Sequence, residues 1–259
     1  EMTDEFIQPL LAWYDENKRI LPWRDKKNAY YTWVSEIMLQ QTRVEAVKPY
    51  FARFIQELPD IPALAACPQE KLLKLWEGLG YYSRVRNMQL AAQEMVEKYN
   101  GKLPEDFSLL LSLKGIGSYT AGAIASIAYG IPVPAVDGNV FRVITRMTED
   151  PQDIMKPAFR KKTEAMLLEI IPKDRPGDFN QAMMELGAVV CVPNGQPKCD
   201  LCPVRRFCQA RLHGTMENYP VKAPKKARSI ENRTVLVIQD GNSTAIRKRP
   251  PKGLLAGLY

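Results

Sequence analysis

Four cysteines fall within 18 residues of this 259-residue chain and constrain its fold more than any other feature. They follow the spacing Cys191-x7-Cys199-x2-Cys202-x5-Cys208, whereas Cys67 stands alone. Clustered cysteines in a chain that shows no secretory pattern favour metal ligation over disulfides. Four thiolates can hold one zinc ion or a [4Fe–4S] cluster. Zinc ribbons usually carry two C-x2-C pairs and this loop has one, so the spacing favours iron–sulfur, with zinc as the alternative.

Residues 1–222 have the pattern of an almost entirely helical region. Apolar residues recur at intervals of three and four, and Pro and Gly separate the stretches. The spacing predicts helices over residues 4–17, 30–41, 44–57, 68–76, 84–99, 118–129, 138–147, 157–170 and 178–190. A further helix at 107–112 is expected as the arm that precedes a glycine-containing turn. No strand-like alternation precedes about residue 230. No apolar run approaches the ~20 residues that a membrane helix needs. We therefore expect a mainly α fold without a membrane partner.

The composition changes near residue 220, where a basic segment containing prolines is typical of a linker. We expect a helical region at 1–222, a linker at 223–231 and a second unit at 232–259. In that unit, residues 234–238 and 244–249 alternate like strands around a turn at 239–242. Because a lone hairpin is marginally stable, we expect the chain to be a fragment of a longer protein.

A glycine-containing turn between two predicted helices suggests a phosphate-binding hairpin. The chain carries 36 Lys and Arg against 29 Asp and Glu, a net charge of +7 that weakly favours a polyanionic partner. Gly115 and Gly117 allow positive φ and close approach of the backbone, and Ser118 opens a helix whose free N–H groups can bind an anion. Together with Lys114 they are candidate DNA-binding residues. The alternative is an ordinary helix–turn–helix connection.

Two acidic residues stand in different predicted environments. Glu36 lies about 60° from Trp33 and Leu39 around a helical wheel, at the edge of the apolar face, where a raised pKa suits a general acid. Asp137 precedes a helix, where the helix start should lower its pKa and keep it charged, able to stabilise a cationic sugar. Such a pair suits glycosidic bond cleavage. The alternatives are that Glu36 is a solvated residue at the edge of its helix and that Asp137 only caps the helix that follows it.

In this order, these features resemble the endonuclease III/MutY superfamily of base excision glycosylases. The resemblance covers residues 3–222 and implies a two-lobed helix-hairpin-helix fold with the active site between the lobes. It also implies a [4Fe–4S] loop at residues 191–208, whose first cysteine gap is here one residue longer than is usual in the family.

Three features point to the MutY branch of that superfamily. Residues 33–42 resemble its catalytic-acid helix, with Glu36 as the acid. Tyr119 stands where lyase members carry a Schiff-base lysine, so no imine can form at that position. Residues 232–259 resemble the truncated start of a Nudix-like domain that reads 8-oxoguanine, and residues 253–259 match its opening.

The resemblance implies roles for further residues. The alternative for several of them is an ordinary place in the hydrophobic core. The adenine pocket would contain Arg19, Trp23, Arg24 and Gln181. Gln41 and Tyr81 would insert into the base stack, and Thr42 and Leu79 would contact the opposing base. Tyr119 would assist catalysis at the sugar.

The implied function is that of a monofunctional adenine DNA glycosylase of base excision repair. It would act as a cytoplasmic, nucleoid-associated monomer on double-stranded DNA with an A:8-oxoguanine or A:G mispair, leaving an abasic site. One alternative is a bifunctional glycosylase/lyase for oxidised pyrimidines, which Tyr119 disfavours. Another is a non-enzymatic iron–sulfur DNA-binding module or redox sensor, which gives no role to Glu36 and Asp137. A Nudix hydrolase would need an acidic helix that the sequence does not contain.

Overall fold

A computed structural model describes all residues except 1–3, 25–26, 225–229, 231, 233, 251–252, 254–256 and 258–259. The chain divides into one compact unit, Glu1–Ala223, and a second unit, Pro224–Tyr259. Helices dominate the first unit, so the prediction of a mainly α fold is confirmed. Among the described residues, no helix is long and apolar enough to cross a membrane.

Every helix predicted from periodicity is present in the first unit, with ends shifted by a few residues at most. In chain order the helices are η1 (Asp4–Phe6), α1 (Ile7–Asn17), α2 (Ala29–Leu39), α3 (Val44–Glu57), α4 (Ile61–Ala66), α5 (Gln69–Trp76), α6 (Ser83–Lys98), α7 (Phe107–Ser112), α8 (Ser118–Tyr129), α9 (Gly138–Thr148), α10 (Pro157–Ile170), α11 (Pro176–Val189), η2 (Cys199–Leu201), η3 (Arg205–Phe207), α12 (Gln209–His213) and η4 (Met216–Asn218). The sequence analysis missed α4, α12 and the 3-10 turns η2, η3 and η4, because so few residues show no helical period. The equally short α7 was predicted from the glycine-containing turn that follows it.

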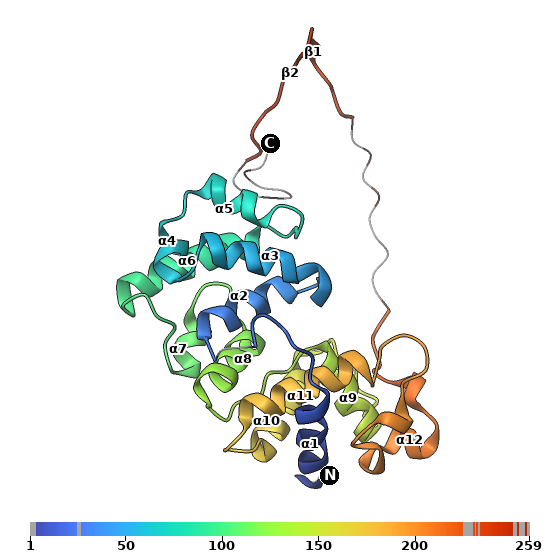
Figure 1. Cartoon of the computed structure of the whole chain (residues 1–259). Coiled ribbons are helices and arrows are strands. Elements are labelled where there is room, and N and C mark those ends of the chain that lie inside the picture. The colour runs from blue at the N-terminus through green and yellow to red at the C-terminus, as the bar shows by residue number, and fades with distance from the viewer. Residues whose placement is uncertain are drawn as a thin grey trace. The chain divides into compact units, whose positions relative to one another are not determined.

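Two separate hydrophobic cores divide the first unit into two lobes. The first lobe packs α2 to α8 around buried side chains such as Trp33, Phe54 and Trp76. The second lobe packs α1 with α9, α10 and α11 around Tyr14 and Phe179. Figure 1 shows α1, from the start of the chain, beside α11 in this second group. The predicted two-lobed arrangement is confirmed.

Helix α8 joins the lobes, since it packs against α2 on one side and α11 on the other. Gly177 of α11 permits the close packing of α11 on α8. A Cβ on it would lie 2.6 Å from the carbonyl oxygen of Ser126, and one on Gly122 of α8 would lie 2.2 Å from that of Pro134, in the segment that leads to α9. Because real Cβ atoms do not approach backbone so closely, a side chain at Gly177 would push α11 away from α8. The same helix carries Tyr119 at its start.

The second unit contains a short antiparallel hairpin of β1 (Gln239–Asp240) and β2 (Ser243–Thr244). Our prediction of strands at 234–238 and 244–249 was therefore wrong in position and length. The turn consists of Gly241 and Asn242 alone, with φ of 55° at the glycine. Gln239 and Asp240, which were predicted to belong to the turn, instead form the first strand. The apolar side chains at 235–238 are exposed and lack the burial that would fix a strand. Most of the 253–259 match lies outside the described residues.

Candidate active site

A cavity of about 1090 Å³ lies between the two lobes. Glu36 of α2 and Asp137 at the start of α9 both line it, so the fold brings together two residues that are 101 positions apart in the sequence. The other predicted site residues that line it are Arg19, Trp23, Arg24, Gln41, Thr42, Tyr119 and Gln181. Leu79, Tyr81 and the hairpin residues Lys114, Gly115, Gly117 and Ser118 lie outside this lining.

The Glu36 carboxyl is buried more deeply than its predicted place at the edge of the apolar face, and only 8% of the residue is exposed. The hydroxyl of Tyr119 donates a hydrogen bond to Glu36 Oε2 and lies 3.3 Å from the sulfur of Met184. Burial raises the pKa of Glu36 to about 7; the charge of Asp137 adds to this rise and the Tyr119 hydrogen bond opposes it. The predicted raised pKa is confirmed. A carboxyl with this pKa is substantially protonated at neutral pH and can act as an acid.

Asp137 caps α9, as predicted. Its Oδ1 accepts a hydrogen bond of 2.8 Å from the backbone N–H of Val140, and its Oδ2 accepts one of 2.7 Å from Asn139 Nδ2. The prediction of a lowered pKa was wrong: burial raises the pKa of Asp137 above 3.8, and these hydrogen bonds offset only part of that rise. Both carboxylate oxygens nevertheless face N–H donors, which favour the charged form.

Replacing Glu36 with glutamine should stabilise the fold at alkaline pH. The Glu36 pKa of about 7 in the folded protein lies above its ordinary value of 4.5, so the folded state holds a proton that the unfolded chain releases. Stability is therefore lost as the pH rises from 4.5 through about 7. We expect Glu36→Gln to exceed the wild type by on the order of 1–3 kcal/mol at pH 8.5, a shift of a few degrees in Tm, and to match it near pH 4.5. The same shift at both pH values would contradict this, and the exposed Glu97→Gln is the control.

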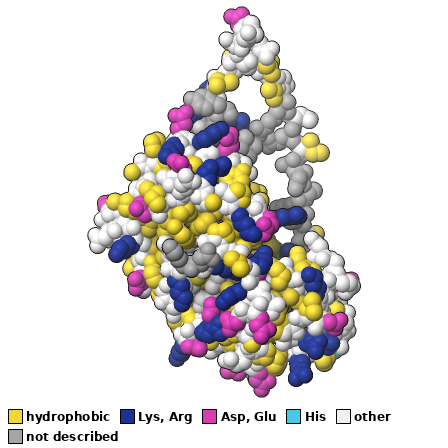
Figure 2. Space-filling model, viewed as in Figure 1, with side chains coloured by type: hydrophobic (Ala, Val, Ile, Leu, Met, Phe, Trp, Pro, Cys, Tyr) yellow, Lys and Arg dark blue, Asp and Glu magenta, His cyan; other side chains and the backbone are white. Residues whose placement is uncertain are grey.

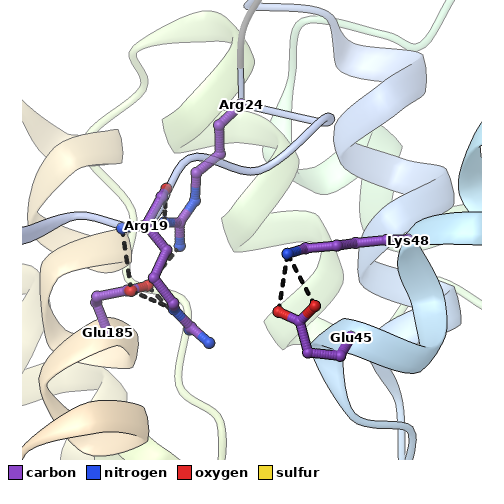
Figure 3. A network of polar contacts seen from close by, with 5 residues as sticks. All are labelled: Arg19, Arg24, Glu45, Lys48 and Glu185. Carbon is purple, nitrogen blue, oxygen red and sulfur yellow. Dashed lines mark hydrogen bonds and ion pairs between the residues drawn. The ribbon is translucent and has the colours of Figure 1, made fainter.

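An ion-pair cluster forms one wall of the cavity (Figure 3). The Glu185 side chain of α11 is fully buried and receives two arginines from the segment before α2. Arg19 Nε donates to Oε1, while Arg19 Nη2 and Arg24 Nη2 donate to Oε2 at 3.1 and 2.9 Å. Burial acts to raise the pKa of Glu185, but the arginines overcome it and the pKa lies below its ordinary value. In Figure 3 the separate pair Lys48–Glu45 lies on α3.

Glu185 was missed in the sequence analysis, although a signal was available. It lies between Met183 and Leu186 on the apolar side of α11, the same pattern that drew attention to Glu36. Two other residues predicted for the pocket, Trp23 and Gln181, line the same cavity. Trp23 is buried with its ring edge-on to Phe51 at 5.3 Å between centroids. Gln181 is half-buried and donates to the carbonyl oxygen of Gly177 at 3.3 Å.

The predicted hairpin connects α7 to α8. Gly115 has φ of +78°, and a Cβ there would lie 2.8 Å from that of Asn87, so the predicted close approach is confirmed for this glycine. It is wrong for Gly117, which has φ of −93° and open space around it. Gly117 caps α8 without a side-chain hydrogen bond, Lys114 is exposed, and Ser118 Oγ donates to Glu164 of α10 at 2.8 Å.

The segments predicted to enter DNA lie at the surface of the first lobe. Gln41 and Tyr81 both adopt the left-handed backbone region, with φ of 62° and 49°, which non-glycine residues seldom occupy. Tyr81 is 63% exposed, Gln41 is exposed and Thr42 is half-buried. The Leu79 side chain is buried in the core of the first lobe, which agrees with the alternative of an ordinary core residue.

The four clustered cysteines line one small cavity beside the second lobe, together with Arg146, Arg205 and Arg211. Among the described residues, no three His, Cys, Asp or Glu side chains converge closely enough to hold a single metal ion. Burial raises the pKa of Cys202 to about 12 and also raises the pKa values of Cys199 and Cys208. Cys67 lies in the first-lobe core, away from this loop.

Helix α9 runs from the cavity to the cysteine loop. Arg142 Nε donates to the carbonyl oxygen of Cys191 at 2.7 Å, and its Nη2 donates to Asn139 Oδ1 at 2.8 Å. Asn139 in turn donates to Asp137. One turn further on, Arg146 Nη1 lies 3.3 Å from the Cys191 sulfur. A chain of hydrogen bonds therefore connects the Asp137 carboxylate to the cysteine loop.

Comparison with known proteins agrees with this geometry. Residues 34–173 match the family described as HhH-GPD superfamily base excision DNA repair protein. The chain is 37% identical to the adenine DNA glycosylase of Buchnera aphidicola subsp. Acyrthosiphon pisum over 98% of its own length and 73% of that protein. It is 37% identical to the human adenine DNA glycosylase over 98% of its own length but only 56% of the human protein. The chain belongs to the HhH-GPD superfamily and, within it, to the family of the adenine DNA glycosylases.

Solved structures share the fold. A thermostable thymine-DNA glycosylase matches with a TM-score of 0.72 and 24% identity, over 81% of this chain and 96% of that one. Endonuclease III in a non-covalent DNA complex matches with a TM-score of 0.67 and 24% identity, over 83% and 99%. The two-lobed helical fold is therefore shared with both of these proteins.

Proposed function

We propose that the chain is a monofunctional DNA glycosylase that removes adenine mispaired with 8-oxoguanine or guanine and leaves an abasic site. The observation that carries this proposal is the pair of Glu36 and Asp137, which face one interlobe cavity in unlike surroundings. A single copy supplies both lobes of the cavity, which supports action as a monomer.

Adenine must leave the duplex to reach this cavity, so the first step is base flipping. Glu36, protonated near neutral pH, then donates its proton to N7 of adenine. The bond between N9 and C1′ breaks, and adenine leaves as a neutral base. The Asp137 carboxylate, held by Val140 and Asn139, stabilises the positive charge that develops on the sugar. Water adds to C1′ and gives its proton to Glu36, which restores the acid.

Tyr119 supports a hydrolytic reaction without a lyase step. Its hydroxyl binds one oxygen of Glu36, which leaves the other oxygen for the proton that is transferred. No described residue that lines the cavity is a lysine, so those residues offer no amine for a Schiff base. The bifunctional alternative lacks a nucleophile in this part of the site.

The ion-pair wall suits recognition of adenine. The Watson–Crick edge of adenine presents an N1 acceptor and an N6 amino donor. Arg19 and Arg24 line the cavity and supply N–H donors for N1, and the buried carboxylate of Glu185 behind them holds both guanidinium groups in place. Trp23 and Gln181 line the same cavity and complete the proposed pocket.

DNA contact would come from a few local elements. Figure 2 shows Lys and Arg side chains interspersed with Asp and Glu on the visible face. This mixture supports binding through defined features: the backbone of the 113–118 hairpin with Lys114, and the exposed Gln41 and Tyr81. We propose that Gln41 and Tyr81 fill the space left by the flipped base.

We also propose that Cys191, Cys199, Cys202 and Cys208 hold a [4Fe–4S] cluster. The four cysteines line one cavity, and three arginines lie beside them to balance the negative charge of the cluster. A bound cluster would fix the loop through iron–thiolate bonds. Arg142, which donates hydrogen bonds to Cys191 and Asn139, would then hold Asn139 and Asp137 in position.

Replacing one cysteine ligand should remove the cluster. For Cys202→Ser we expect loss of the visible absorption band, an iron content well below the about four atoms per chain of a full cluster, and a lower Tm, because cluster binding stabilises the folded loop. Cys67→Ser is the control and should keep its iron. Full iron content in the Cys202 variant, or one zinc and no iron in the wild type, would contradict the proposal.

The function is tested with duplex DNA that carries one adenine opposite 8-oxoguanine. We expect strand breakage only after alkali, and no covalent adduct on borohydride treatment. Breakage without alkali together with a trapped adduct would favour the bifunctional alternative. No breakage by protein that binds the duplex and contains iron would favour the non-enzymatic module.

A further inference from the structure

We propose that Arg84 is a positioning residue that fixes two surface segments against each other and against the helix of Glu36. The segments are residues 40–42 and 78–81, called here the insertion loops. The inference rests on the proposed function, in which Gln41 and Tyr81 enter the base stack.

One guanidinium joins the two insertion loops. Arg84 Nη1 donates to the carbonyl oxygens of Ile37 and Gln40, both at 2.7 Å. Its Nη2 donates to the carbonyl oxygens of Leu79 and Gly80 at 3.1 and 3.3 Å. These four acceptors are backbone atoms, so the bridge acts on the course of the chain in both loops. A planar, forked guanidinium can span them, whereas the single ammonium of lysine cannot.

Further contacts hold the same unit from other sides. Arg84 lies over the rings of Trp76 and Tyr81, at 5.4 and 5.5 Å from their centroids. The Trp76 indole N–H donates to the carbonyl oxygen of Gly80 at 3.0 Å. A Cβ on Gly78 would lie 2.1 Å from the hydroxyl of Tyr50, so the loop packs tightly against α3. Such packing can hold Gln41 and Tyr81 in their sparsely populated backbone region.

The bridge also reaches the proposed acid. Ile37 and Gln40 lie at the end of α2, where carbonyl groups have no partner within the helix and a cation is favourable. Glu36 directly precedes Ile37. A displacement of either insertion loop would therefore move the last turn of α2 and the acid on it. We infer that Arg84 aligns insertion into DNA with placement of Glu36.

The test compares two duplexes. In the first, adenine faces 8-oxoguanine; in the second, it faces a tetrahydrofuran abasic analogue, so no partner base must be held apart. We expect Arg84→Lys to lower the single-turnover rate on the first duplex by roughly 10–100-fold, the scale of a misplacement of about 1 Å. On the second duplex we expect a smaller loss, because less unstacking is required there and only the displacement of Glu36 still slows excision.

Arg53→Lys is the matched control. Arg53 also lies over a tyrosine ring, that of Tyr50 at 5.0 Å, and donates to one carbonyl at 3.4 Å, but it bridges no loops. We expect it to retain wild-type rates. In parallel, 2-aminopurine next to the target adenine reports unstacking on binding, and we expect a smaller fluorescence rise with Arg84→Lys.

Wild-type rates and fluorescence for Arg84→Lys would overturn the inference. So would an equal loss on both duplexes with a lowered Tm, which would show a general structural role. The fluorescence arm needs no cleavage, so it reports on Arg84 even if the wild type proves not to excise adenine. A wild type that does not excise adenine would count against the proposed function and not against the role of Arg84.

Discussion

Glu36→Gln is expected to slow adenine excision by about 10²–10⁴-fold, the usual contribution of a general acid. Glutamine keeps the size of the side chain and can still accept the hydrogen bond from Tyr119, but it has no acidic proton to give to N7. The measurement is the single-turnover rate on a duplex with adenine opposite 8-oxoguanine. DNA affinity should stay close to that of the wild type, because the buried carboxyl is not part of the proposed DNA-contact surface.

The pH dependence gives this prediction a second readout. Because the pKa of Glu36 is raised to about 7, the wild-type rate should fall as the pH rises through that value and the proton is lost. The residual rate of Glu36→Gln should lack this fall. Glu45→Gln is the control, since Glu45 lines the same cavity in an exposed ion pair with Lys48. An unchanged rate in Glu36→Gln, or the same descending limb in that variant, would remove Glu36 from the acid role.

Asp137→Asn is expected to lower the excision rate by about 10²–10³-fold, the scale of losing one group that stabilises transition-state charge. Asparagine is also a favoured helix cap, so its side-chain oxygen can still accept from Val140 and keep α9 in place. The change therefore removes the negative charge and retains the local structure. Single-turnover kinetics should show the loss, while Tm and DNA binding stay near wild-type values.

Asp60→Asn offers a matched control for the Asp137 variant. Asp60 caps α4 by accepting from Ala63 N–H at 2.8 Å, the same role far from the cavity, and its replacement should leave the rate unchanged. In the wild type, the rate should also rise with pH through the pKa of Asp137, which lies above 3.8. A near-normal rate for Asp137→Asn would show that no charge is needed at this position.

Periodicity predicted the longer helices because each buries one face, and burial repeats every three to four residues. It could not reveal α4 or α12, with six and five residues. The strand positions predicted for the second unit were wrong for a related reason. The apolar run at 235–238 looked like a strand, but these side chains are exposed, and alternation without burial does not define strand position.

Within the site, local sequence was informative where one helix determines the environment. Glu36 lies in the apolar surroundings of its own helix, and its raised pKa followed from that pattern. The position of Asp137 as the cap of α9 could also be predicted from the local sequence. The direction of its pKa shift could not, because burial between the lobes raises the pKa more than the hydrogen bonds at the helix start lower it.

Pairings between distant segments were out of reach. Glu185 meets Arg19 across 166 positions, and Arg84 reaches Ile37 across 47. Those contacts exist only once the two lobes and the insertion loops are in place, so no spacing rule could have shown them.

The central claim is that two carboxyl groups between the lobes remove adenine from DNA. Its most direct measurement is recovery of the free base from a duplex with radiolabelled adenine opposite 8-oxoguanine and an excess of protein. We predict one adenine for each abasic site with the wild type, and less than about one hundredth of that amount from Glu36→Gln or Asp137→Asn over the same interval. Adenine release at the wild-type rate by both variants, or no release by iron-containing wild-type protein bound to the duplex, would contradict the claim.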